Sequence, residues 1–182
     1  MDALMEASVE RQRAAVSEFV ASGADPCSLD AVDSIGSYSR PFQDVESLAN
    51  DVDLIVEGEF GDSTMTMPPP RTLAARVRSE LSISEVLLGS PSDDAILIEA
   101  GARVLQSGEG FIRSIAQGFD QCSVDHLLLF LVEIEEGEYG IVSQGYVTFI
   151  HGVVDVGRSS NLFGEGGTVE SLKKDIRRMA GD

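Results

Sequence analysis

The chain has 182 residues, 43% of them hydrophobic and 24% charged, and its formal net charge is −18. This composition excludes a disordered chain, and the length suits one domain with a real core. We expect no nucleic-acid binding, because the charge repels phosphate, and no membrane insertion, because no apolar run approaches the roughly 18 residues that span a bilayer.

The first fifty residues predict a helical extension. Residues 2–22 place Leu4, Val9, Val16 and Phe19 roughly on one side of a helix. Residues 24–41 are rich in Ser, Asp and Gly and predict a loop, and residues 42–50 predict a short helix. We therefore divide the chain into an N-terminal helical extension, 1–50, and a β-barrel domain with a C-terminal helix, 51–182.

The middle of the chain predicts strands. Residues 53–61 alternate between the two faces of a strand, and Gly58 inside them indicates a bulge or a tight bend. Residues 71–88 predict a long strand with one wet face, and residues 95–99 a short one. The glycine-rich segment 101–121, with a weak strand at 111–115, predicts a long hairpin or mobile loop, where we expect any ligand mouth to lie.

The last third centres on a hairpin. Two apolar runs on either side of a Glu- and Gly-rich turn, beginning at His126, predict buried strands, followed by strands at 145–150 and 152–156. A glycine-rich loop, 157–167, leads to the clearest helix. Thr168 is its N-cap, and four basic residues lie near the negative end of its dipole. The apolar stripe of this helix is Val169, Leu172, Ile176 and Met179.

Two cysteines, Cys27 and Cys122, stand far apart without a CxxC pair, which argues against a zinc site. Two interpretations stay open: a disulfide that ties the N-terminal region to the barrel in an exported protein, or small buried hydrophobic residues in a cytosolic one.

The two histidines, His126 and His151, each lie at the edge of an apolar strand. We expect partly buried rings whose nitrogens are bonded to backbone groups. A catalytic dyad of Cys122 and His126 is the functional alternative, but a nucleophile relay also needs an orienting acid.

Other polar motifs predict no site. Residues 164–167, Gly-Glu-Gly-Gly, precede a helix, but acidic residues flank them and a flexible connector is the favoured interpretation. The acidic sets lack the spacing of a calcium loop, and a weak cation site is their alternative. These sets are Asp51 with Asp53, Asp93 with Asp94, and Glu133 with Glu135, Glu136 and Glu138. We assign no catalytic, cofactor-binding or metal-ligating residue and expect no cofactor.

Three segments carry a family resemblance: VDLIVEGEF at 52–60, SISEVLLG at 82–89 and HLLLFLVEIEEGEYGIVSQG at 126–145. They resemble a poorly characterised group of small bacterial β-barrel domains. The resemblance implies a barrel of the oligonucleotide/oligosaccharide-binding (OB) type over about residues 50–152, similar in outline to the inhibitor domains of metalloproteinase inhibitors. The cysteine-led N-terminus of those inhibitors is absent here, so their activity is not carried over.

The predicted fold is therefore α+β and mainly β: an antiparallel, OB-like Greek-key barrel with an N-terminal helical extension and a C-terminal amphipathic helix. We expect a non-catalytic binding or protein-interaction module, not an enzyme, with a protein partner or an unknown small ligand. Two alternatives are an acidic decoy or inhibitor of a basic partner and an enzyme with an unrecognised site. The compartment stays open between the cytoplasm and export after cleavage of a signal peptide, and so does the oligomeric state.

Overall fold

The computed structural model describes residues 2–34, 42–67, 72–116, 119–124, 126–155, 162–163 and 167–181, without the side chains of residues 2–4 and 143, and it is mainly β. The described elements follow one another along the chain as α1 (Asp2–Ala21), the 3₁₀ turn η1 (Pro26–Ser28), β1 (Ala31–Ser34), α2 (Val45–Ala49), β2 (Leu54–Thr66), β3 (Ala75–Leu88), β4 (Ala95–Ser107), β5 (Gly110–Ala116), β6 (His126–Glu135), β7 (Glu138–Ile150), β8 (Val153–Val154) and α3 (Val169–Ala180).

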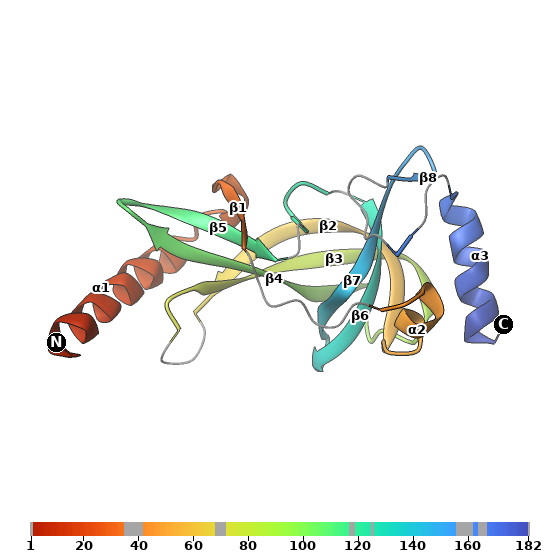
Figure 1. Ribbon diagram of the computed structural model, residues 1–182, viewed down its shortest axis with the longest axis horizontal. Coiled ribbons are helices and arrows are strands. Elements are labelled where there is room, and N and C mark those ends of the chain that lie inside the picture. The colour runs from red at the N-terminus through yellow and green to blue at the C-terminus, as the bar shows by residue number, and fades with distance from the viewer. Residues whose placement is uncertain are drawn as a thin grey trace.

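The strands form a sheet in the order β1-β5-β4-β3-β2-β6-β7-β8, and a further pairing of β4 with β7 closes five of them into a barrel. The molecule is elongated, with α1 at one end and α3 at the other (Figure 1). Beyond the barrel, β4 continues into a hairpin with β5, which reaches toward α1 (Figure 1). The barrel is therefore the centre of the molecule, and the helices lie outside it.

The sheet is mixed, so the antiparallel arrangement predicted for the barrel is not confirmed. The β4–β7 pair and the β1–β5 pair are parallel, and the other pairings are antiparallel. The barrel pair has a simple geometric cause. Directions alternate around an antiparallel ring, and a ring of five strands cannot alternate throughout, so at least one pair must be parallel. In this chain that pair is β4–β7.

Several strands differ from their predicted lengths. β2 continues to Thr66, and β4 runs to Ser107, where it forms with β5 the long hairpin that was one of the two interpretations of residues 101–121. β1 lies within the predicted loop 24–41 and pairs with β5, more than 80 residues away in sequence. For β1, this pairing with a distant strand outweighs the local glycine and serine content of the segment. The bulge predicted at Gly58 is confirmed, because the β2–β3 register shifts between Glu57 and Gly58.

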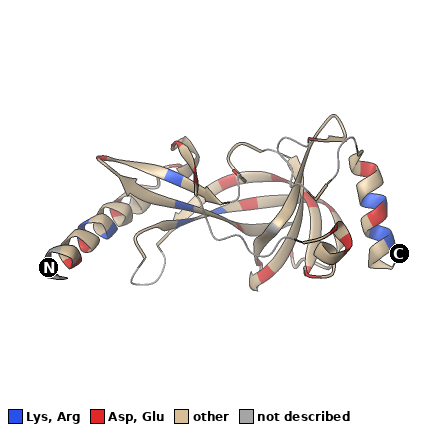
Figure 2. Cartoon of the chain, viewed as in Figure 1, with Lys and Arg blue, Asp and Glu red and all other residues tan. Residues whose placement is uncertain are grey.

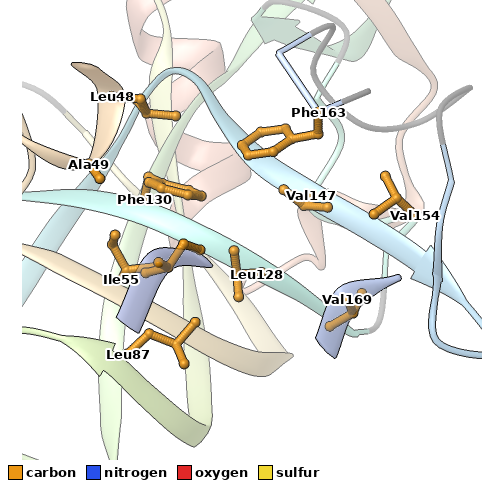
Figure 3. Packing of buried hydrophobic residues seen from close by; sticks show 11 residues of the cluster. Leu48, Ala49, Ile55, Leu87, Leu128, Phe130, Val147, Val154, Phe163 and Val169 are labelled. Atoms are coloured by element: carbon orange, nitrogen blue, oxygen red, sulfur yellow. The ribbon is translucent and has the colours of Figure 1, made fainter. Parts of the chain in front are cut away.

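Apolar side chains fill the barrel and cover its outside. The interior takes residues from all five barrel strands together with Phe119. Alternate residues of the same strands, such as Ile55, Leu128 and Phe130, point outward and pack against α2 and α3 (Figure 3). β6 is thus covered on both faces, which explains why residues 127–131 form a continuous apolar run rather than an alternating one.

The two long helices pack on different parts of the sheet. α1 buries Val16 against β3, β4 and β5, where the ring of Phe19 stacks on Phe111 at 4.3 Å. α3 begins as predicted, with the Thr168 hydroxyl accepting a hydrogen bond from the Ser171 N–H, and it buries Val169 and Ile176. The division at residue 50 stays a prediction, and most of the 157–167 loop lies outside the described residues.

Candidate functional site

A cleft opens where β4 and β7 separate. The two strands pair over Leu97–Glu99 and Glu138–Gly140, after which β4 turns toward β5 while β7 stays beside β6. A cavity of about 340 Å³ lies at this fork. Its described lining residues are Glu99, Ala100, Gly101, Ala116, Phe119, Val132, Ile134, Gly140, Ile141, Val142 and Tyr146. We call it the fork cleft.

Two glycines keep the fork cleft open. Gly101 has a φ of +79°, a conformation that L side chains rarely adopt, and an added Cβ there would lie 3.2 Å from the Cβ of Ala116. A Cβ on Gly140 would lie 2.9 Å from the Ile134 side chain. The bend of β4 at Gly101 and the bare backbone at Gly140 thus both leave room between the strands.

The lining of the fork cleft is mostly apolar and includes two polar side chains, Tyr146 and Glu99. Burial, helped by the negative charge of Asp33, raises the pKa of Tyr146, so its phenol stays protonated at neutral pH. Glu99 forms ion pairs with Arg103 at 2.9 Å and with Arg76 at 3.4 Å. The cleft is therefore suited to holding an apolar group and has a polar edge.

Part of this cleft belongs to the segment in which we expected a ligand mouth. Gly101, Ala116 and Phe119 all come from residues 101–121, most of which form the β4–β5 hairpin, the first of the two predicted alternatives. The contributions of β6 and β7 were not foreseen, because the sequence does not reveal that β7 lies beside β4.

His126 contacts carboxylates rather than the backbone groups that we expected. Its Nε2 lies 2.6 Å from Glu57 Oε1 and its Nδ1 lies 3.0 Å from Glu59 Oε1. Ionised carboxylates only accept hydrogen bonds, so both nitrogens donate when His126 is an imidazolium. Partial burial lowers its pKa, but the hydrogen bonds and charges of both glutamates outweigh burial and raise the pKa above the ordinary 6.5.

The charged contacts continue from His126 to α3. Lys173 contacts Glu57 and lies 2.8 Å from Glu85 Oε2, and Arg177 contacts Glu85 on its other side. Lys173 is buried, whereas the sequence predicted only an exposed base near the end of the helix dipole. Burial lowers the pKa of Lys173, but its hydrogen bonds to Glu57 and Glu85 outweigh this and raise it.

A second cavity, of about 260 Å³, lies next to His126, and its described lining includes Ser123, Thr148, Phe149 and Asp155. The Phe149 ring meets the His126 ring edge-on at 5.1 Å. His126 thus stands between a small cavity and two carboxylates that occupy both of its nitrogens.

The cysteines exclude the alternative of a Cys122–His126 dyad. Cys27 and Cys122 form a disulfide with their Cα atoms 5.3 Å apart, so Cys122 has no thiol for His126 to activate. His151 lies at the exposed turn after β7 with a φ of +51°.

The remaining acidic sets make no cluster. Among the described residues, no group of three or more His, Cys, Asp and Glu side chains is arranged to hold a metal ion. Asp53 instead accepts a hydrogen bond from the Glu133 backbone N–H at 2.9 Å. Of residues 164–167, all but Gly167 lie outside the described residues.

The fold and the fork cleft together define the class of this protein: a mainly β protein with a closed five-stranded barrel and a cleft where two barrel strands part. Comparison with known proteins finds no family model that matches the chain and no curated protein with significant similarity. Within the described part of the chain, no helix is long and apolar enough to cross a membrane.

Proposed function

We propose that this chain is a non-catalytic binding module and that its ligand occupies the fork cleft. The observation that carries the proposal is an open cavity of about 340 Å³ with a mostly apolar lining. Binding sites are concave and mostly apolar with a few polar groups, and this volume falls in the lower part of their usual range of about 300–1,000 Å³. A protein side chain or a small apolar ligand suits such a cleft.

The proposal includes a barrel of the OB type. Support comes from the order of the strands around the ring, β2-β3-β4-β7-β6. The consecutive strands β2, β3 and β4 pair with their neighbours in sequence. β6 then pairs with the other edge of β2, and β7 pairs with β6 and with β4, which closes the ring. OB folds are five-stranded Greek-key barrels that bind ligands on the barrel face and its adjoining loops. A cleft beside β4 is consistent with that use of the fold.

An exported location also belongs to the proposal. Disulfides form and persist in oxidising compartments, and Cys27 and Cys122 are joined. Export would expose the module to partners outside the cytoplasm.

An enzyme is the second candidate, because His126 meets carboxylates beside a cavity. Two facts make it the weaker one. Both nitrogens of His126 are bonded to Glu57 and Glu59, and an imidazolium that donates from both nitrogens is not a general base. The acidic decoy has less support, since acidic side chains are spread along the molecule from α1 to α3 rather than gathered in one patch (Figure 2).

A matched pair of substitutions tests the site. Ile134 lines the fork cleft and is 49% exposed, while Ile150 lines the cavity beside His126 and is 57% exposed. The full chain, Ile134→Glu and Ile150→Glu are immobilised and exposed to extract from the source organism, and bound material is eluted in rising salt. We expect the unaltered chain and Ile150→Glu to keep the same ligand at high salt, and Ile134→Glu to lose it.

The other outcomes of this experiment contradict a ligand site in the fork cleft or favour one of the two alternative functions. Equal retention by all three proteins contradicts a site in the fork cleft. Loss by Ile150→Glu alone places the site beside His126 and favours the enzyme. Release of all bound material at low salt favours the decoy, because exposed charge pairs are screened by salt and apolar contacts are not.

A further inference from the structure

Two arginines stand at the polar edge of the fork cleft. Arg76 on β3 and Arg103 on β4 form ion pairs, at 3.4 Å and 2.9 Å, with Glu99, which lines the cleft. We propose that these two guanidinium groups bind the carboxylate of a ligand whose aliphatic chain occupies the fork cleft. The inference rests on the proposed function of the cleft and narrows its ligand to an aliphatic carboxylate.

The first support is the charge balance of the two arginines. Arg76 and Arg103 are direct partners across the β3–β4 pair, and like charges directly opposite each other on neighbouring strands destabilise a sheet. Both are paired with the one carboxylate of Glu99, so one positive charge is left over. In the described part of the chain, no other carboxylate pairs with either arginine. A carboxylate from a ligand would complete the neutralisation.

The second support is the accessibility of the donors. The side chains of Arg76 and Arg103 are 37% and 36% exposed, whereas that of Glu99 is 10% exposed. All hydrogen bonds of the two arginines to described residues start from Nη1. The Nε–Nη2 edge of each planar guanidinium therefore has no partner among those residues. Such an edge can hold a carboxylate through two parallel hydrogen bonds.

Other charged groups nearby do not compete for this place. Arg78, on the same face of β3, is paired with Glu138 at 2.8 Å, and the side chain of Glu138 is 8% exposed. Glu80 is exposed but lies further along β3, beyond Arg78 from the arginine pair. The formal net charge of −18 repels an anion only at long range, where physiological salt screens it beyond about 8 Å.

The lining of the fork cleft orients such a ligand. Apart from Glu99 and Tyr146, the described lining residues are apolar or glycine. The negative charge of Asp33 acts on Tyr146, which disfavours an anion at that residue. The carboxylate of the ligand is therefore expected at the edge formed by the arginines, and the aliphatic chain against the apolar lining.

Isothermal titration calorimetry of the full, disulfide-bonded chain with octanoate tests the inference. Octanol, which has the same number of carbon atoms but no charge, is the comparison. At low salt we expect octanoate to bind at least about tenfold more tightly than octanol, because hydrogen bonds to charged groups are strong enough for a change of that size. Rising salt should bring the affinity for octanoate toward that for octanol, because salt screens the exposed arginines and leaves the apolar contacts.

Four variants locate the carboxylate and the chain. Arg76→Gln and Arg103→Gln should each weaken octanoate binding by about tenfold and leave octanol binding unchanged. Arg178→Gln is the matched control, because it removes the same charge from an arginine of α3 whose side chain is 78% exposed, and it should leave both affinities unchanged. Ile134→Glu should weaken the binding of both probes, because Ile134 lines the fork cleft.

The inference and the proposed function can fail separately. Equal affinity for octanoate and octanol, or octanoate binding that neither arginine substitution weakens, overturns the inference; the proposed function stands if Ile134→Glu still weakens binding. Octanoate binding that needs the arginines but not Ile134 also overturns the inference, because the ligand then lies outside the cleft. Absence of octanoate binding overturns it too, and retention of a ligand from extract stays the separate test of the cleft.

Discussion

Lys173 is a buried charged side chain that lies outside the apolar cores. Only 7% of its side chain is exposed, and the side chain of its partner Glu57 is 12% exposed. Glu57 also contacts His126. Lys173 and His126 therefore both neutralise the Glu57 carboxylate, which is largely removed from water. A buried charge that loses its partner is costly, because water cannot replace that partner.

Lys173→Met tests this residue. Methionine keeps most of the stem length but removes the charge, so Glu57 is left with less compensation. We expect the free energy of unfolding to fall by about 3–5 kcal/mol, measured by urea denaturation at neutral pH. Lys174→Met, one residue further and exposed, is the control and should change it by less than about 0.5 kcal/mol. Equal effects of the two changes would contradict the role of Lys173.

The spacing of residues in the sequence places Lys173 on the apolar stripe of α3, but it does not reveal which carboxylates Lys173 contacts. It stands four residues after Val169 and three before Ile176, so it lies on the apolar stripe of α3. Its partner Glu85 lies on β3, 88 residues earlier, and its partner Glu57 lies on β2, still farther back in the sequence. His126 likewise looked like a strand-edge histidine, because nothing in its own neighbourhood reveals that β2 places Glu57 and Glu59 next to it.

At the scale of elements, β2 depends on one glycine. Gly58 is buried where β2 lies between β3 and β6. A Cβ added there would lie 2.5 Å from the Ser82 carbonyl oxygen, a backbone atom that moves only if the strand moves. Gly61, in the same strand, would place its Cβ no closer than 3.8 Å to any neighbour.

Gly58→Ala should therefore destabilise the barrel by about 1–3 kcal/mol, the usual cost of overpacking. Gly61→Ala should change the free energy of unfolding by less than about 0.5 kcal/mol. Thermal or urea unfolding of the two variants measures both effects. If Gly58→Ala is as stable as Gly61→Ala, β2 and β3 are not packed as closely as described.

Elements with a strong local pattern were predictable, and elements made by distant pairing were not. The stripe and N-cap of α3 and the bulge at Gly58 all have local signals, and the structure contains them. β4 was predicted to stop before Gly101, since a glycine usually interrupts a strand. It continues because β3 and β5 pair with it beyond that point. The fork cleft depends on these pairings, so only its 101–121 side was foreseen.

At the scale of the whole molecule, one covalent link joins the N-terminal part to the barrel. Cys27 follows α1 by six residues and Cys122 precedes β6 by four, and the sequence separation of the two cysteines is 95. A link over so long a loop limits the freedom of the unfolded chain. The disulfide therefore stabilises the arrangement of α1, β1 and the barrel rather than any one element.

Reduction of this disulfide should lower the free energy of unfolding by about 2–5 kcal/mol. The measurement is urea denaturation with and without a thiol reductant. A Cys27→Ala, Cys122→Ala double variant is the control and should resemble the reduced chain in both conditions. An unaltered chain that is insensitive to reductant would mean that the two cysteines are not joined.

The central claim is that a ligand occupies the fork cleft. The most direct measurement replaces Ile134 with a photoreactive benzophenone amino acid, irradiates the protein in extract from the source organism, and determines the mass of the product. The same substitution at Ile150 is the comparison. We predict a specific covalent adduct at position 134 and none at position 150. No adduct at position 134, or the same adducts at both positions, would contradict the claim.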